Sequence, residues 1–147
     1  MKKLSLYVFL VLMWCNVGVA DVRELVPLSE FRKTLKSGQV KPEQLLHIYH
    51  RCSAVYTVIY DLKYEKFMAK KIKNPREMIE LEKFKKEYIG GFEASAFGVL
   101  VYKLNYKQLE AVRFLNKEIS KFVESYKKGI PGRVTDDYHE CEKIPVG

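Results

Sequence analysis

Residues 42–73 read PEQLLHIYHRCSAVYTVIYDLKYEKFMAKKIK, and this stretch decides the fold of the chain. Its apolar residues recur at steps of three and four, which places them on one face of a helix with 3.6 residues per turn. That face consists of Leu45, Ile48, Tyr49, Cys52, Val55, Tyr56 and Ile59. Pro42 is suited to the first helical position, and Pro75 disfavours helical backbone at Asn74. The pattern predicts a helix over 42–73, about 48 Å long at 1.5 Å per residue.

The predicted central helix needs to be covered on more than one side, because further apolar residues lie off its main face. These residues are Leu46, Ala54, Val58 and Leu62. Two other long helices are available to cover it, and they are predicted over 75–103 and 106–128. One or two short helices are expected outside these three. The sequence therefore predicts an all-α fold, a small helical bundle of three main helices plus one or two short ones.

The helix predicted over 75–103 should be capped by Asn74 and run antiparallel to the central helix. Its apolar face is marked by Met78, Leu81, Phe84, Tyr88 and Phe92. Gly90 and Gly91 interrupt it, and each glycine costs about 1 kcal/mol relative to alanine in a helix interior. Either the helix breaks at 90–91, or small residues there let a neighbouring helix approach closely. We favour close packing.

The helix predicted over 106–128 has the most regular apolar face. Its members are Leu109, Val112, Leu115, Ile119, Phe122, Val123 and Tyr126. Asn105 and Gln108 have the spacing of a capping box at its start. Ser29 is predicted to cap a short helix that ends at Gly38, and residues 135–137 are predicted to cap a last short turn that carries Cys141.

The first twenty residues have the three parts of a secretory signal peptide. Lys2 and Lys3 precede an apolar run, and Gly18-Val19-Ala20 supplies a small-x-small cleavage site. The apolar run is shorter than the roughly 20 residues that a membrane-spanning helix needs, so we favour cleavage over a retained anchor. Cleavage after Ala20 leaves a single domain over 21–147, exported to the periplasm if the source is bacterial and otherwise secreted.

Two of the three cysteines remain after the predicted cleavage, and they are expected to form a disulfide. An even number of cysteines in an exported chain favours oxidation, so Cys52 should pair with Cys141. A loop of about 90 residues corresponds to roughly 4.6 kcal/mol of stabilisation in the chain-entropy treatment. The bond would tie the tail, residues 129–147, back to the central helix.

No motif in the sequence specifies a reaction or a cofactor. A weak metal or proton-binding patch is one hypothesis, and its residues would be Glu43, His47, His50 and His139. The first three share one stripe of the central helix, which we interpret in the first place as its solvated face. Zinc bound through Cys52 is disfavoured, because His50 and His47 lie roughly 160° and 140° around the helix from it.

Positive charge is concentrated at the predicted turn between the first two long helices. Residues 63–76 contain one acid, Glu65, and six cations, which are Lys63, Lys66, Lys70, Lys71, Lys73 and Arg76. Loss of Lys2 and Lys3 lowers the net charge of the chain from +8 to +6, so most of the remaining excess lies here. Such lysines can complement a helix dipole and keep an exposed turn soluble. They can also bind an anionic partner.

The function favoured by these observations is that of an exported, non-enzymatic binding protein that uses the basic turn. Its partner would be an acidic protein or an anionic lipid surface, while export disfavours nucleic acid. The first alternative is a small metal-binding protein or enzyme that uses the histidine patch. The second is a protein associated with a membrane surface, which the same basic turn would serve.

Overall fold

The computed structural model describes residues 26–35, 39–129 and 132–146, and this part of the chain contains helices and no strands. The predicted signal peptide over 1–20 and the predicted helix end at Gly38 lie outside the described residues. The elements follow in the order α2 (Leu28–Thr34), α3 (Pro42–Met68), α4 (Pro75–Phe84), η1 (Lys85–Ile89), α5 (Gly90–Gly98), η2 (Val99–Lys103), α6 (Gln108–Lys128) and α7 (Arg133–Cys141). The two η elements are π-helical turns. The predicted all-α class is confirmed.

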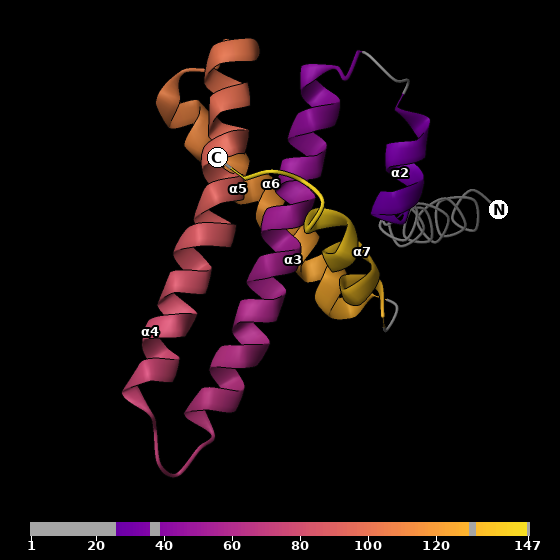
Figure 1. The fold of residues 1–147 in the computed structure, drawn as a ribbon. Coiled ribbons are helices and arrows are strands. Elements are labelled where there is room, and N and C mark those ends of the chain that lie inside the picture. The colour runs from indigo at the N-terminus through magenta and orange to yellow at the C-terminus, as the bar shows by residue number, and fades with distance from the viewer. Residues whose placement is uncertain (1–25, 36–38, 130–131, 147) are drawn as a thin grey trace, which may run out of the picture.

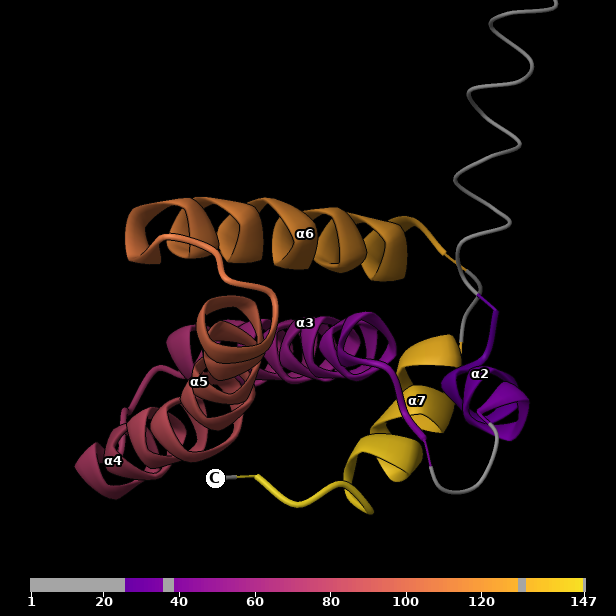
Figure 2. The ribbon, with the colours of Figure 1, turned by 90° about the horizontal axis from the view of Figure 1, so that it is seen from above.

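Helix α3 is the central element (Figures 1 and 2). Helix α6 lies on one side of it, the continuous segment from α4 through η1 to α5 lies on another, and α7 lies near its N-terminal half. Leu46, Val55 and Val58 pack into one apolar cluster with α5 and α6. Cys52 and Tyr56 belong to a second cluster with α2, α5 and α7. The prediction that several neighbours bury α3 is confirmed. The helix begins at Pro42 as predicted but ends at Met68, because residues 69–74 form the turn that reverses the chain.

The second predicted helix is continuous across Gly90 and Gly91, and a π-helical turn precedes the glycines. This turn holds more residues than an α-helical turn and shifts the buried face by one position. Ile89 is therefore buried, whereas Tyr88, which an uninterrupted α-helix would have buried, is 39% exposed. Asn74 caps the start of α4 as predicted, since its side chain accepts a hydrogen bond from the backbone N–H of Arg76 at 3.0 Å.

Gly91 does permit a close approach, but the neighbour is the C-terminal tail and not a helix. A Cβ atom added at Gly91 would lie 2.0 Å from Cγ1 of Val146. Figure 2 shows the end of the chain running back towards α5. The small residue is required here because the tail crosses the surface of α5 at this level.

Helix α6 begins two residues later than predicted, and Asn105 is not its cap. Asn105 has a left-handed backbone with φ of 58°, a conformation that asparagine tolerates better than most residues. It closes the preceding helix instead, where the N–H of Tyr106 donates to the carbonyl of Leu100 at 2.9 Å. The predicted face is right from Leu115 to Tyr126, but Leu109 and Val112 are exposed.

Helix α6 shares a buried core with α3 as far as Val58, and beyond it Lys127 of α6 forms a surface ion pair with Asp61. His47 and His50 of α3 contact Phe122 and Phe114 of α6, and the shared apolar cluster reaches no further along the buried residues of α3 than Val58. The remainder of α3 and its partner α4 extend beyond the body as a two-helix arm (Figure 1). We call this part, residues 59–84, the arm.

The predicted disulfide between Cys52 and Cys141 is present, with the two Cα atoms 5.6 Å apart. It joins the middle of α3 to the last residue of α7, and both cysteines are buried. The predicted caps of the short helices are wrong. Ser29 lies inside α2, which starts after Pro27, and residues 135–137 lie inside α7, which starts after the left-handed Gly132.

A buried ion pair lies next to the disulfide. The guanidinium of Arg51 on α3 donates to Asp137 on α7, and both side chains are 1% exposed. The Tyr126 hydroxyl of α6 also donates to Asp137 and accepts from Arg51 Nε at 3.1 Å. The second carboxylate oxygen of Asp137 accepts the N–H of Leu28 at 2.8 Å. Arg51 further donates to the carbonyl of Val26, so one charged pair connects α2, α3, α6 and α7.

Replacing both cysteines, Cys52→Ala with Cys141→Ala, should lower the free energy of unfolding by about 3–5 kcal/mol, because the unfolded chain loses its cross-link. Urea denaturation followed by circular dichroism measures this change. The wild-type protein in reductant should match the variant. Equal urea midpoints for the oxidised wild type and the variant would show that the bond contributes little.

Asp137→Asn should cost about 3–5 kcal/mol, because it leaves the Arg51 guanidinium buried without a counter-charge. The double change Arg51→Met with Asp137→Leu should recover most of this loss in a double-mutant cycle measured by urea denaturation. Asp61→Asn is the matched control, since Asp61 pairs with Lys127 at 2.8 Å on the exposed surface and should cost less than about 1 kcal/mol. A loss as small for Asp137→Asn would contradict the assignment.

Candidate functional site

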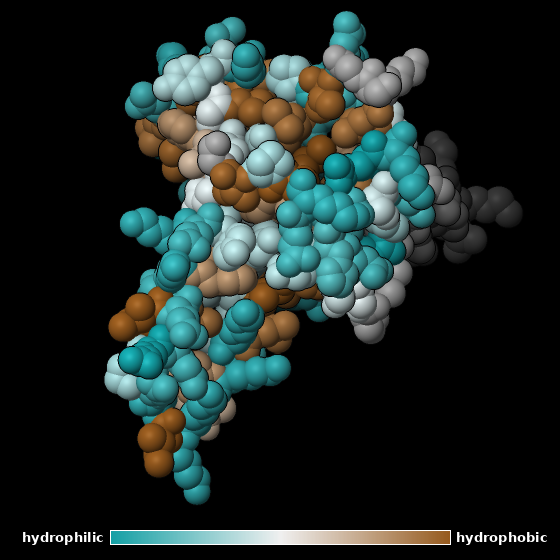
Figure 3. Space-filling model, viewed as in Figure 1, coloured by the Kyte–Doolittle hydropathy of each residue, from teal (hydrophilic) through white to brown (hydrophobic). Residues whose placement is uncertain are grey.

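The six cations of the predicted basic turn lie on the arm, five of them from Lys66 onward towards its free end and Lys63 nearer to the body, where its ammonium lies over the Phe84 ring. We call this group the basic tip; it consists of Lys63, Lys66, Lys70, Lys71, Lys73 and Arg76. All six are exposed. Figure 3 shows mostly hydrophilic side chains, with some apolar ones among them, at the narrow lower end of the molecule, which projects away from the larger body. The structure thus brings together the residues that the sequence singled out for an anionic partner.

Two cations of the basic tip have partners within the arm. Lys70 forms an ion pair with Glu77 at 2.7 Å, and the Lys63 ammonium lies 4.7 Å from the centre of the Phe84 ring. The side chains of Lys66, Lys71, Lys73 and Arg76 make no ion pair or hydrogen bond with any described residue. Four cations are therefore available to a partner from outside the chain.

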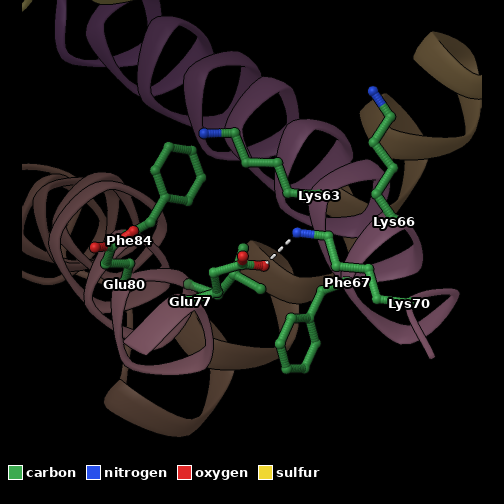
Figure 4. A pocket seen from close by; sticks show the side chains of 8 residues that line it. Lys63, Lys66, Phe67, Lys70, Glu77, Glu80 and Phe84 are labelled. Carbon is green, nitrogen blue, oxygen red and sulfur yellow. Dashed lines mark hydrogen bonds and ion pairs between the residues drawn. The ribbon is translucent and has the colours of Figure 1, made fainter. Parts of the chain in front are cut away.

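A shallow groove of about 320 Å³ lies between α3 and α4 behind the tip. Phe67, Leu81 and Phe84 supply its apolar walls. Figure 4 shows Lys63 and Lys70 reaching across it towards α4, while Lys66 points away from the groove. Glu77 and Glu80 line the opposite side, so the groove carries both signs of charge whereas the end of the turn carries only cations.

The arm is held by contacts between its own two helices. Phe67 and Leu81 are buried, and the Tyr60 hydroxyl hydrogen-bonds to Glu82 at 3.1 Å. The ammonium of Lys85 lies 5.4 Å from the Tyr60 ring centre. These contacts give the tip a defined shape although α6 does not cover it.

The sequence analysis missed an exposed apolar side chain at the tip. Ile72 is 89% exposed and lies in the turn between Lys71 and Lys73. The sequence signal for it was weak, because the predicted helix ran to residue 73 and included Ile72, whereas the observed helix ends at Met68.

The proposed histidine patch is not assembled. His50 is only 3% exposed and contacts Phe114, while His47 packs between Phe31 and Phe122. The interpretation of this stripe as a solvated face was wrong, because α6 and α2 cover it; only Glu43 is exposed as expected. His139 lies on the surface of α7 beside Glu142 at 3.4 Å. Within the described ranges, no three histidine, cysteine, aspartate or glutamate side chains are grouped so as to hold a metal ion.

Burial lowers the pKa of His47 and of His50 from 6.5 to about 4. Arg51 lowers the pKa of His47 further and Glu118 on α6 opposes the shift in both. Both rings are therefore neutral at physiological pH and serve as packing groups of the α3–α6 contact.

In the part of the chain that the structure describes, none of the helices is both long enough and apolar enough to cross a bilayer. Comparison of the sequence and the structure with known protein families, with curated proteins and with solved structures finds no match. The site therefore has to be interpreted from its own chemistry.

Acidification should destabilise the protein between pH 6.5 and 4 through His47 and His50. The unfolded chain binds protons at these histidines in that window and the folded chain does not, so stability falls as the pH falls. The loss approaches about 1.4 kcal/mol per pH unit for each histidine. Urea midpoints measured across the window should fall less steeply in His50→Gln. If His50→Gln leaves the slope of the wild type unchanged, this account is contradicted.

Proposed function

We propose that this chain is an exported, non-enzymatic binding protein whose basic tip contacts an anionic partner. The observation that carries the proposal is the set of four exposed cations, Lys66, Lys71, Lys73 and Arg76, that lack an acidic partner among the described residues. Lysines that serve only helix stability or solubility are commonly interspersed with acids on the same surface. Here Glu77 and Glu80 line the groove between α3 and α4 and do not lie in the turn itself.

The position of the tip supports the same function. A group of like charges at the end of a projecting arm attracts a partner of opposite charge over about 10 Å at moderate salt and raises the rate of encounter. The arm presents the cations without steric interference from the body (Figures 1 and 3). The contacts of Phe67 and Leu81 hold the two helices of the arm together, so the tip needs little ordering when it binds.

Export is the part of the proposal that concerns location. The Cys52–Cys141 disulfide supports it, because disulfides persist in the periplasm and outside the cell and are rare in reducing compartments. The basic, apolar and small-residue pattern of residues 1–20 supports it independently. The periplasm of a bacterium and the extracellular space satisfy both observations.

The alternative function, a metal-binding protein or small enzyme that uses Glu43, His47, His50 and His139, has no support from the geometry. Two of its residues are packed among aromatic rings and the other two lie on the surface. The basic tip is therefore the site on which we base the function.

Charge reversal at the tip should weaken binding to a polyanion. In the triple variant Lys66→Glu, Lys71→Glu, Lys73→Glu, the affinity for fluorescent poly-L-glutamate should fall at least about tenfold, since each lost charge contact is worth roughly 1 kcal/mol. Lys70 is left unchanged because its reversal would place a second carboxylate against Glu77. Fluorescence anisotropy at low salt measures the affinity, and circular dichroism should be unchanged.

The matched control reverses three exposed lysines away from the tip, at Lys103, Lys107 and Lys117. This variant has the same net charge as the tip variant, so it reports the effect of overall charge alone. It should bind poly-L-glutamate nearly as well as the wild type. An equal loss in both variants, or no loss in either, would contradict a specific role for the basic tip.

A further inference from the structure

We propose that the anionic partner of the basic tip is a lipid bilayer surface, and that the tip inserts Ile72 between the lipid headgroups. This inference rests on the proposed function of the tip and adds the identity of the partner. The observation behind it is the exposed apolar side chain of Ile72 at the end of the arm, which binding through cations alone would not require.

Ile72 is the most exposed large apolar side chain in the described part of the chain, at 89%. Met68, on the last turn of α3, is 47% exposed, and Ile79, on α4, is 68% exposed. Single exposed aliphatic residues are common on protein surfaces. Ile72 differs in its position, because it stands at the end of a projecting arm with Lys71 and Lys73 as its immediate neighbours in the chain.

The shape of the molecule permits contact between the tip and a flat surface. The turn between α3 and α4 lies at the end of the arm, away from α2, α6 and α7 (Figure 1). Apolar atoms are exposed at this lower end among hydrophilic ones (Figure 3). The arm can therefore stand on a bilayer with only the turn and the adjacent helix ends in contact.

The two kinds of side chain at the tip match the two layers of an anionic membrane surface. Lysine ammonium groups can remain at the level of the lipid phosphates while their alkyl chains extend along apolar surface. Ile72, between them, can then reach the boundary with the acyl chains, as the apolar residues of membrane-surface helices do. Each lysine should raise the affinity for an anionic surface roughly fivefold, and insertion of the isoleucine roughly tenfold.

An acidic protein explains the site less completely. An acidic segment lying in the groove between the two helices would meet Glu77 and Glu80 along one wall, and those carboxylates would repel it. A membrane that touches only the turn avoids both carboxylates, which lie behind the tip. A protein partner would in addition need an apolar pocket for Ile72, whereas any bilayer provides an apolar layer.

A tryptophan at the tip tests insertion directly. Trp14 is the one tryptophan of the sequence and lies within the proposed signal peptide, so the processed form, residues 21–147, with Ile72→Trp reports only on the tip. Mixed phosphatidylcholine and phosphatidylglycerol vesicles should shift its emission to shorter wavelength, and brominated acyl chains should quench it. Vesicles of phosphatidylcholine alone should do neither.

A second test compares the vesicle affinity of the wild type with that of two single variants. Ile72→Ser should lower binding to the mixed vesicles about tenfold and leave poly-L-glutamate binding unchanged, since the side chain contributes no charge. Leu109→Ser is the control, because Leu109 is 63% exposed on α6 away from the arm. It should bind vesicles as the wild type does.

The two probes separate the two proposals. A blue shift with quenching on anionic vesicles, together with the Ile72→Ser loss, supports insertion. Binding to poly-L-glutamate without any response of the tip tryptophan to vesicles would overturn the lipid partner and leave the anionic-partner function standing. Vesicle binding that is equal in the wild type and Ile72→Ser would overturn insertion. Failure to bind either probe would overturn both proposals.

Discussion

The structure depends on the buried ion pair between Arg51 and Asp137. A charge taken out of water is costly unless it is paired and its remaining donors and acceptors are used. Arg51 meets this condition through Asp137, Tyr126 and the carbonyl of Val26, and Asp137 through the N–H of Leu28 as well. Since these partners come from four helices, the pair is satisfied only when all four are in place. The disulfide at Cys52 and Cys141 fixes the same contact covalently.

This constraint divides the molecule into a body and an arm. The helices that share the ion pair enclose the N-terminal half of α3, and the hydrophobic clusters lie there. Beyond Val58, α3 packs mainly on α4, with Phe67 and Leu81 buried between them, and Asp61 forms a surface ion pair with Lys127 of α6. The cations at the end of the arm are therefore placed where the buried network does not depend on them, so Lys66, Lys71 and Lys73 can change in charge without disturbing the core.

The helices and the disulfide could be predicted from the sequence, because helices follow from the local periodicity of apolar residues and the disulfide follows from the number of cysteines. The apolar period of 42–59 and the even number of cysteines left by the predicted cleavage each point to one answer. The π-helical turn before Gly90 could not be predicted, because no residue pattern distinguishes it, and it decided that Ile89 and not Tyr88 is buried. The burial of His47 and His50 could not be predicted either, because it depends on how α6 packs across α3, and the sequence of α3 alone does not contain that information.

The clustering of cations was predictable from charge alone, whereas Ile72 was missed because the helix was predicted to run to residue 73 and its apolar face was followed only to Ile59. The Arg51–Asp137 pair could have been inferred from the disulfide. Asp137 precedes Cys141 by one helical turn, and Arg51 is adjacent to Cys52, so joining the two cysteines brings the two charges to the same place.

The contact between α2 and α7 has a consequence for the order in which the chain can fold. Leu28 and Arg32 of α2 bind Asp137 and Glu140, and these partners are 109 and 108 residues away in the sequence. Ribosomal synthesis delivers α2 first and α7 last among the described helices, so these two contacts form only after nearly all of the described chain has been made, although Phe31 can pack on His47 earlier. A chain that is stopped short of α7 therefore keeps the contacts of α2 with α3 but lacks both links of α2 to Asp137 and Glu140.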